Sequence, residues 1–173
     1  THYLRRSRII VGDVKNVNEE FVEVNNKKIY FDYLIICGGS SYNAPFKEQK
    51  AVYAARAIRL RNCYDDLCKA KKILIIGGGL VGVELAGEIC WKYKNEKEIT
   101  IVHAHDRLIE RNNEKTKNFA EKYLKKKGVK IMFKERIVKA KNNKYVTDKG
   151  REIEADMAFL CTGITSNINF MRR

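Results

Sequence analysis

The sequence predicts an α/β fold in which helices cover a parallel β-sheet. Between residues 72 and 133, strand and helix patterns alternate in the order strand, helix, strand, helix, strand. That order is typical of parallel strands joined by right-handed crossovers. The runs 72–76 and 157–161 are almost entirely apolar, as expected for strands buried on both faces of a sheet. The length of 173 residues allows one such domain, or one domain and part of another.

The first 50 residues have the patterns of β-strands. Residues 8–12 form a short apolar run, and residues 21–24 alternate before Asn25-Asn26, so that residues 28–30 can pair back as a hairpin. Residues 33–37 are nearly all apolar, which predicts another strand buried on both faces.

The rest of the chain contains the remaining elements. Leu60, Tyr64 and Leu67 recur at helical spacing, and Gly128 is well placed to end a later helix. In chain order we expect helix 57–70, strand 72–76, helix 80–93, strand 99–102, helix 114–127, strand 129–133, an antiparallel meander over 135–155 with turns at Asn142-Asn143 and Asp148-Lys149-Gly150, and strand 157–161.

The composition excludes several classes of protein. Hydrophobic residues make up 45% and charged residues 32% of the chain, which excludes bulk disorder. The odd number of five Cys argues against a disulfide framework and for a reducing, intracellular compartment, with the cytosol and the mitochondrion both left open. Residues 73–91 form the longest apolar stretch, but its five Gly and two Glu argue against a membrane span.

The chain is strongly basic. Its net charge of +14 arises from 35 Lys+Arg against 21 Asp+Glu, and such a field attracts nucleotides, nucleic acid and acidic lipid. The alternative to anion binding is a general enrichment of the sequence in Lys and Asn, because the basic residues are spread along the chain.

A glycine-rich turn carries the strongest functional signal. Gly77-x-Gly79-x-x-Gly82 stands between an apolar strand and a helix. The first Gly permits a tight turn, the second lets a pyrophosphate approach the backbone, and the third lets helix and strand pack closely. Gly78, Leu80 and Val81 complete this loop, where the helix start offers free N–H groups to phosphates. The pattern predicts a dinucleotide site; the alternatives are a turn without ligand and a methyl-donor site.

Side chains after the next strand bear on the choice of nucleotide. His103 lies 21 residues beyond the last glycine, where an acidic residue would bond the ribose hydroxyls and repel a 2′-phosphate. Because His103 does neither strongly, NADPH is not excluded. His105 and Arg107 could meet a phosphate, although Arg107 could instead pair with Asp106 or Glu110 on the surface.

Two carboxylates fall on the helix after the glycine loop. Glu84 lies near the sheet edge where a nicotinamide would lie, which makes it a candidate ligand. Its other explanation is a favourable interaction with the helix dipole. Glu88, one turn further on, is expected to be structural.

Residues 31–40, 75–86 and 155–163 form three segments whose order and spacing span most of the chain. They resemble the signatures around the NAD(P)H domain of pyridine-nucleotide, two-dinucleotide flavoproteins. The segment Thr100-Ile101-Val102-His103 is similar to the apoptosis-inducing-factor-like branch, to which the ferroptosis-suppressor type of NAD(P)H:quinone reductase belongs. Type II NADH dehydrogenases are the neighbouring possibility.

This resemblance implies a domain organisation and a reaction. Residues 51–165 would form a Rossmann-like, three-layer NAD(P)H-binding domain with a parallel sheet and an antiparallel β-meander. Residues 1–50 would be strands and linker of an incomplete FAD domain, and residues 166–173 the return linker to it. NAD(P)H would give a hydride to FAD, which then reduces a quinone or another acceptor.

The resemblance also implies roles for individual residues. The three motif glycines would line the pyrophosphate, Glu84 would approach the nicotinamide end, His103 the adenosine ribose, and Gly163 the far side of the dinucleotide. Cys37-Gly38-Gly39 replaces the family's usual Ala-Thr-Gly. The FAD glycine loop and the later Gly-Asp signature are missing from the sequence. We therefore expect this chain alone to bind FAD poorly and to have no turnover by itself.

The cysteines do not predict a catalytic site. Cys63 and Cys68 have the CxxxxC spacing of disulfide reductases, but on a helix they point about 140° apart and lie outside the usual context. Cys37, Cys90 and Cys161 have apolar surroundings and are expected to be buried. No Cys/His cluster has zinc spacing and no nucleophilic triad is evident, so we predict no catalytic residue and no metal ligand.

Two other roles follow from the charge. The chain could be a non-enzymatic basic module that contacts nucleic acid, although no recognition helix or stacking-aromatic motif supports sequence-specific binding. Residues 123–127 could touch anionic lipid in a longer parent, the alternative being a solvated helix end. The first residue is Thr, so the sequence could be an internal piece. The electron acceptor and the oligomeric state are left open.

Overall fold

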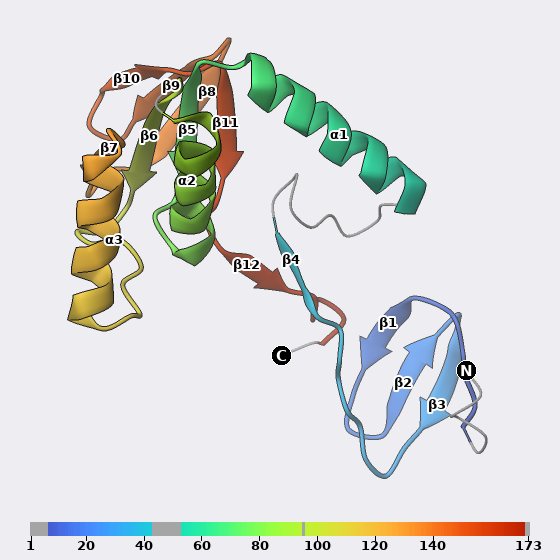
Figure 1. The fold of residues 1–173 in the computed structure, drawn as a ribbon. Coiled ribbons are helices and arrows are strands. Elements are labelled where there is room, and N and C mark those ends of the chain that lie inside the picture. Colours follow the sequence, from blue (N-terminus) through green and yellow to red (C-terminus); the bar gives the residue numbers. More distant parts are fainter. Residues whose placement is uncertain (1–6, 43–52, 95, 172–173) are drawn as a thin grey trace. The chain divides into compact units, whose positions relative to one another are not determined.

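The computed structural model describes residues 7–42, 53–94 and 96–171. The chain divides into two compact units, one formed by residues 1–40 with 166–173 and the other by residues 41–165 (Figure 1). The domain boundary expected at residues 50–51 lies outside the described residues.

A parallel four-stranded sheet forms the centre of the larger unit. Its strand order is β11-β5-β6-β7, and every neighbouring pair is parallel. Its strands are β5 (Lys72–Ile76), β6 (Glu98–His103), β7 (Lys130–Phe133) and β11 (Met157–Leu160). The α/β fold with a parallel sheet predicted from the sequence is confirmed.

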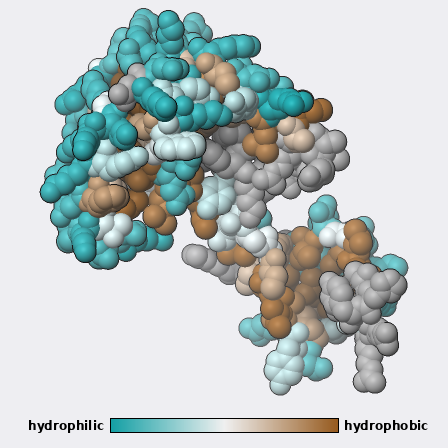
Figure 2. Space-filling view, viewed as in Figure 1, coloured by the Kyte–Doolittle hydropathy of each residue, from teal (hydrophilic) through white to brown (hydrophobic). Residues whose placement is uncertain are grey.

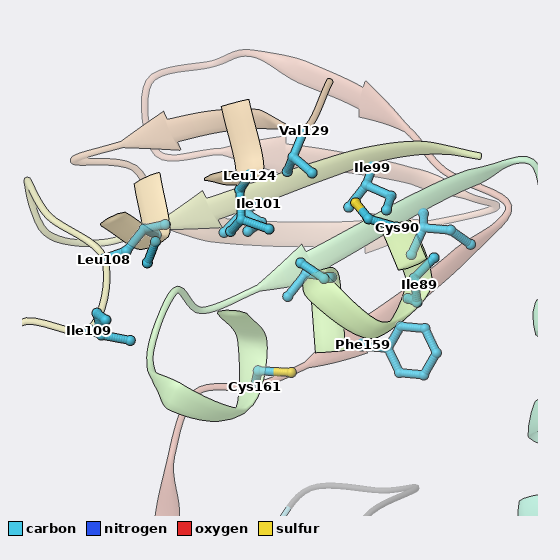
Figure 3. Packing of buried hydrophobic residues seen from close by; sticks show 14 of the residues in the cluster. Ile89, Cys90, Ile99, Ile101, Leu108, Ile109, Leu124, Val129, Phe159 and Cys161 are labelled. Carbon is cyan, nitrogen blue, oxygen red and sulfur yellow. The ribbon is translucent and has the colours of Figure 1, made fainter. Parts of the chain in front are cut away.

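Two helices, α2 (Leu80–Tyr93) and α3 (Glu114–Lys126), pack on one face of this sheet and match the predicted ranges closely. The helix α1 (Tyr53–Lys69) begins four residues earlier than predicted and extends away from the sheet (Figure 1). Ile75 and Ile101, from neighbouring strands, are fully buried against Ala86 of α2 and Leu124 of α3 (Figure 3). Cys63 of α1 is partly buried against the same cluster. The helices thus form the first of three layers.

The antiparallel meander covers the opposite face. Side chains alternate along a strand, so Leu74 and Val102 point away from the helices and pack with Met132 and Ala155. The meander consists of β8 (Ile137–Lys141), β9 (Lys144–Thr147) and β10 (Glu152–Glu154), in the order β10-β9-β8. Helices, sheet and meander make the three layers expected for the fold.

Asparagine and glycine residues form the predicted turns. Asn142 and Asn143 have positive φ values of 50° and 61°, as the two central residues of a type I′ hairpin turn require. Gly150 closes the next turn at φ 77°, with its N–H bonded to the carbonyl of Thr147. Gly128, at φ 80°, ends α3, and its N–H donates to the carbonyl of Lys125 at 3.0 Å.

The smaller unit contains an antiparallel sheet in the order β1-β2-β3. Its strands are β1 (Val14–Val17), β2 (Phe21–Val24) and β3 (Lys27–Tyr30). The predicted hairpin is confirmed, because Asn25-Asn26 connects β2 to β3 with positive φ at both residues. The short strands β4 (Ser40–Tyr42) and β12 (Ile164–Ser166) also pair, where the chain passes between the units.

Two of the apolar runs predicted as strands are wrong, and the first is residues 8–12, which form no strand. Residues 33–37 form no strand, and Tyr33 and Ile35 are 94% and 85% exposed. A strand buried on both faces needs neighbours on each side, and none of the described strands pairs with this segment. Cys37, expected to be buried, is exposed for the same reason. Figure 2 shows hydrophobic side chains on the surface of this smaller unit, whereas hydrophilic side chains cover most of the visible surface of the larger one.

Among the described residues, no helix combines the length and the apolar character needed to cross a lipid bilayer.

Candidate dinucleotide site at the carboxyl edge of the sheet

The candidate site begins at the connection between β5 and α2. Only Gly77, Gly78 and Gly79 separate the end of the strand from the start of the helix. Gly77 adopts φ 112°, a region that side chains rarely tolerate, and a Cβ atom there would overlap the carbonyl of Cys161. A Cβ on Gly82 would overlap the carbonyl oxygen of Gly77. These two glycines are therefore required for the tight turn and for the close approach of α2 to β5.

Gly79 has a different environment. Its backbone is extended, with φ −73° and ψ −173°, and a Cβ atom there would meet nothing within 4 Å. No side chain caps the helix that follows. Because the first N–H groups of a helix have no partner within it, those at Leu80 and Val81 add partial positive charge beside this open space. The loop fits an anionic diphosphate that approaches the backbone at Gly79.

The segment after β6 is hydrogen-bonded to the glycine loop. The N–H of Gly78 donates to Nδ1 of His103 at 3.0 Å, and its carbonyl accepts from the N–H of Ile109 at 2.8 Å. A Cβ on Gly78 would overlap the side chain of Leu108. Residues 103–109 therefore close one side of the loop.

His103 is buried beneath this loop. Burial lowers the pKa of its imidazole, and the nearby Glu110 carboxylate partly opposes that shift. Because Nδ1 accepts a hydrogen bond, the proton of the neutral ring lies on Nε2. Nε2 is buried, has no hydrogen-bond partner, and lies 3.5 Å from Oε1 of Glu110. His103 thus supports the glycine loop from within the protein, and its contact with the adenosine ribose stays a prediction.

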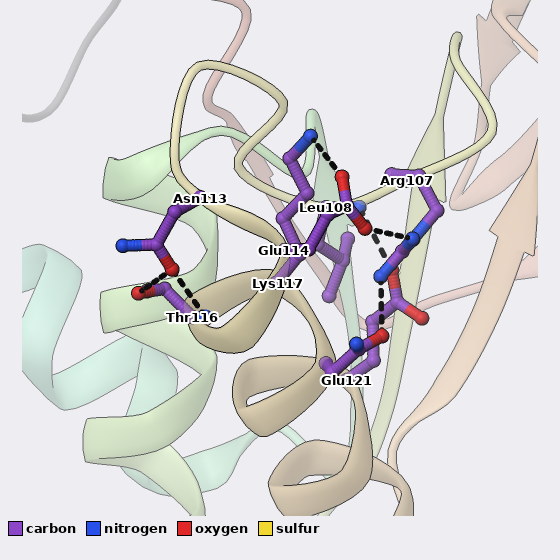
Figure 4. A network of polar contacts seen from close by, with 8 residues as sticks. Arg107, Leu108, Asn113, Glu114, Thr116, Lys117 and Glu121 are labelled. Carbon is purple, nitrogen blue, oxygen red and sulfur yellow. Dashed lines mark hydrogen bonds and ion pairs between the residues drawn. The ribbon is translucent and has the colours of Figure 1, made fainter.

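Arg107 is engaged by α3 (Figure 4). Its Nε donates to Glu121 at 2.8 Å, its Nη1 to Glu114 at 2.9 Å and its Nη2 to Asn118 at 2.7 Å. The surface partners expected from the sequence, Asp106 and Glu110, are not the ones found. All three guanidinium nitrogens already have partners, so this arrangement gives no support to a phosphate contact.

Glu84 is exposed on α2, and the first turn of that helix contains no acidic residue. Its explanation by the helix dipole is therefore weakened, since the dipole acts mainly within the first turn. Its role at the nicotinamide end stays a prediction. Glu88 is also exposed.

Gly163 lies beyond the end of β11, the strand that pairs with β5 in the sheet. It adopts φ 106°, and a Cβ there would meet nothing within 4 Å. The N–H of Cys161 donates to the carbonyl of Ile76 at 2.7 Å, which holds this segment beside the glycine loop. Because parallel strands end at one edge, the structure brings Gly163, His103 and the glycine loop to the same side of the sheet.

The cysteines of the described chain are free thiols. Cys90 and Cys161 are buried as predicted, and burial raises the pKa of Cys161 to about 11, which leaves it an inert thiol. Cys63 is half-buried and Cys68 is exposed, with its Sγ 3.5 Å from Oη of Tyr93. No group of three potential metal ligands occurs within the described ranges.

Sequence reasoning missed the part of the site formed by residues 108–110. Ile109 is buried and adopts φ 43°, which is rare for a β-branched residue. No sequence pattern marks such a conformation. The carboxylate of Glu110 lies 3.5 Å from Nε2 of both His103 and His105, contacts that only the path of this loop creates.

Comparisons with known proteins agree with this geometry. A family model described as pyridine nucleotide-disulphide oxidoreductase matches residues 2–173. Apoptosis-inducing factor homolog A from Dictyostelium discoideum is 33% identical over 95% of this chain and 47% of its own length. Human ferroptosis suppressor protein 1 is 30% identical over 97% of this chain and 48% of its own length. The chain spans about half the length of these curated relatives.

Solved structures share the fold at lower identity. A ferredoxin reductase from Rhodopseudomonas palustris matches with a TM-score of 0.69 and 14% identity, over 93% of this chain and 42% of that one. A water-forming NADH oxidase from Lactobacillus brevis, bound to NADH, matches with a TM-score of 0.67 and 21% identity, over 91% of this chain and 38% of that one.

Proposed function

Because the chain belongs to the pyridine nucleotide-disulphide oxidoreductase family, we propose that it is the NAD(P)H-binding part of an FAD-dependent oxidoreductase. The resemblance inferred from the three sequence segments, including that to the apoptosis-inducing-factor branch, is confirmed by the family model and by the curated relatives. The activity of the whole protein is part of the proposal, since the chain spans about half of those relatives.

The observation that carries the proposal is the glycine loop. Gly77 and Gly82 are fixed by steric contact with the protein, whereas Gly79 faces open space at an uncapped helix start. A diphosphate there would accept hydrogen bonds from the first N–H groups of α2 and would interact favourably with the helix dipole. In this proposal Glu84 borders the nicotinamide end, Gly163 lies at the far side of the dinucleotide, and Arg107 has no direct contact.

Each component has a defined part in the reaction. NAD(P)H supplies a hydride and FAD accepts it, so the chemistry belongs to the cofactors. The residues of this chain bind and orient the dinucleotide. The final electron acceptor is proposed to be a quinone, in keeping with the branch to which the sequence is similar.

The binding step can be tested with Gly79. The Cβ atom of a Val side chain at this position would have no atom of the chain within 4 Å, so the variant is expected to fold. The same side chain would occupy the space needed by the pyrophosphate. We expect the chain to bind NADH or NADPH in calorimetric titration and Gly79→Val to bind at least about tenfold more weakly, a loss of about 1.4 kcal/mol.

A matched control is Gly87→Val on the outer part of α2, where a Cβ also meets nothing within 4 Å. It should bind like the unaltered chain. Equal binding by Gly79→Val and the unaltered chain would contradict the proposal. The redox reaction requires a longer gene product that carries FAD, with NAD(P)H oxidation measured in the presence of a soluble quinone.

A further inference from the structure

We propose that Cys68 is a reactive thiol that forms a mixed disulfide with small anionic disulfides, of which oxidised glutathione is the representative. This reaction is independent of the dinucleotide site. It takes place in a group of side chains at the C-terminal end of α1, which we call the Cys68 cluster. The cluster combines one thiol, two phenols and two ammonium groups, from Cys68, Tyr64, Tyr93, Lys92 and Lys97.

A phenol lies against the thiol of this cluster. Cys68 is exposed, and its Sγ lies 3.5 Å from Oη of Tyr93. The hydrogen bond with Cys68 and desolvation raise the pKa of Tyr93 to about 12, and the nearby carboxylate of Glu96 acts in the same direction. Tyr93 therefore keeps its proton and donates a hydrogen bond to the ionised sulfur. This bond lowers the pKa of the Cys68 thiol, and desolvation of the sulfur only partly opposes that shift.

Two lysines add positive charge around the same thiol. Nζ of Lys92 donates to Oη of Tyr64 at 2.9 Å and lies 5.8 Å from the ring centroid of Tyr93. Nζ of Lys97 lies 4.3 Å from the centroid of the same Tyr93 ring. Both ammonium groups lower the pKa of the Cys68 thiol further. They thus favour the thiolate, which is the form of cysteine that attacks disulfides.

Lys97 also offsets an unfavourable feature of the helix end. Cys68 is the penultimate residue of α1, where the carbonyls of a helix C-terminus disfavour a negative charge. Nζ of Lys97 is bonded to three of these carbonyls. They belong to Leu67 at 2.7 Å, Cys68 at 3.2 Å and Ala70 at 2.6 Å. One ammonium group thus neutralises the part of the helix that would oppose a thiolate.

Two other cysteines provide contrasts. Cys63, on the same helix, is partly buried against the core, and burial, followed by the charge of Asp66, raises the pKa of its thiol. Cys37 is exposed like Cys68 but belongs to the smaller unit. A reagent in solution reaches Cys37 and Cys68 alike, so a difference in their rates measures the effect of the surroundings of each sulfur.

The reaction is a thiol–disulfide exchange. The thiolate of Cys68 attacks one sulfur of the reagent, a new S–S bond forms to that sulfur, and the S–S bond of the reagent breaks. The other half of the reagent leaves as a thiolate and takes a proton from water. Cys68 is oxidised and that half is reduced, so no further oxidant is needed. Oxidised glutathione is an anion at neutral pH, and the two lysines therefore also attract it.

The experiment compares two disulfides of opposite charge. The full chain is incubated at neutral pH with anionic oxidised glutathione or with cationic cystamine, and peptide mass spectrometry follows the modification of each cysteine. With oxidised glutathione we expect Cys68 to react about tenfold or more faster than Cys37. With cystamine the advantage of Cys68 should be smaller, because the lysines of the cluster repel a cation.

Three variants assign the effect to individual groups. Tyr93→Phe removes the hydrogen bond and keeps the ring, and it should slow the reaction of Cys68 with both reagents. Lys92→Gln should slow the reaction with oxidised glutathione more than that with cystamine. The control Lys122→Gln removes an equal charge from an exposed position on α3 and should leave both rates unchanged.

The comparison of Cys68 with Cys37 needs no variant, and equal rates with oxidised glutathione would overturn the proposal. A disulfide between Cys63 and Cys68 in place of the mixed disulfide would also overturn it. An advantage of Cys68 that is as large with cystamine, or an effect of Lys122→Gln that equals that of Lys92→Gln, would contradict the part assigned to the lysines. None of these results depends on dinucleotide binding, so the proposed function is tested separately.

Discussion

The two glycines of α2 serve opposite purposes. Gly82 lies where the helix crosses the glycine loop, and a Cβ there would overlap the carbonyl oxygen of Gly77 and lie 3.3 Å from Cγ2 of Ile75. Gly87, five residues later, has no atom within 4 Å of the position that a Cβ would take. Only the first is therefore required by packing against the chain itself.

This difference predicts opposite changes in stability. Gly82→Ala should lower the free energy of unfolding by about 1–3 kcal/mol, because main-chain atoms must move to admit the methyl group. Gly87→Ala should raise it by about 0.5–1 kcal/mol, since Ala favours a helix interior over Gly. Urea unfolding followed by circular dichroism measures both values. Equal effects of the two substitutions would contradict the packing described for Gly82.

The candidate site was predictable at its glycines but only partly at its side chains. The spacing of Gly77, Gly79 and Gly82 identified the turn, because Gly77 and Gly82 are required by contacts within the chain and Gly79 leaves open space for a ligand. His103 was correctly located at a strand end, but its burial under Gly78 depends on a contact made across the sheet edge. The position of Glu110 depends on the left-handed backbone at Ile109, and no residue pattern indicates that conformation.

At the scale of secondary structure, the elements that pack within the described chain were predicted well. The strands β5, β6 and β11 and the helices α2 and α3 have strong patterns because their side chains meet partners in one core. Residues 33–37 have an equally apolar pattern, yet they are exposed and form no strand. An apolar pattern indicates a tendency to be buried, whereas a strand also requires neighbours to pair with.

The N-terminus of α3 shows how one polar side chain sets the start of an element. Asn113 is the N-cap, and its Oδ1 accepts hydrogen bonds from the N–H of Thr116 at 2.9 Å and from its hydroxyl at 2.9 Å. Asn113→Ala should lower the free energy of unfolding by about 1 kcal/mol, because the first turn of α3 loses its cap.

Asn113→Asp provides the matched control. Asp keeps an acceptor oxygen at the same place and is as good an N-cap as Asn, so its stability should lie within a few tenths of a kcal/mol of the unaltered chain. Thermal unfolding at neutral pH compares the three proteins. A loss as large for Asp as for Ala would show that the amide acts through a contact other than the cap.

At the scale of the whole molecule, the excess of positive charge is distributed. The chain carries 35 Lys+Arg and 21 Asp+Glu, and its basic residues occur in strands of both units and in helices and turns of the larger one. The most concentrated run is Lys125-Lys126-Lys127 at the end of α3, where cations also complement the helix dipole. Distributed charge attracts polyanions by long-range electrostatics and selects no sequence.

We therefore expect the chain to bind duplex DNA only weakly and without sequence preference. Binding to two duplexes of unrelated sequence should be equal at low salt and should fall steeply between about 50 and 200 mM salt, because it depends on the release of counterions. Fluorescence anisotropy with labelled duplexes measures both dependences. Replacement of Lys125, Lys126 and Lys127 by Gln should leave most of the binding at low salt, since the remaining basic residues are spread over the chain.

A clear preference for one duplex, together with binding that persists at high salt, would favour the nucleic-acid module over the oxidoreductase. Loss of all binding in the triple variant would instead locate the interaction at the end of α3.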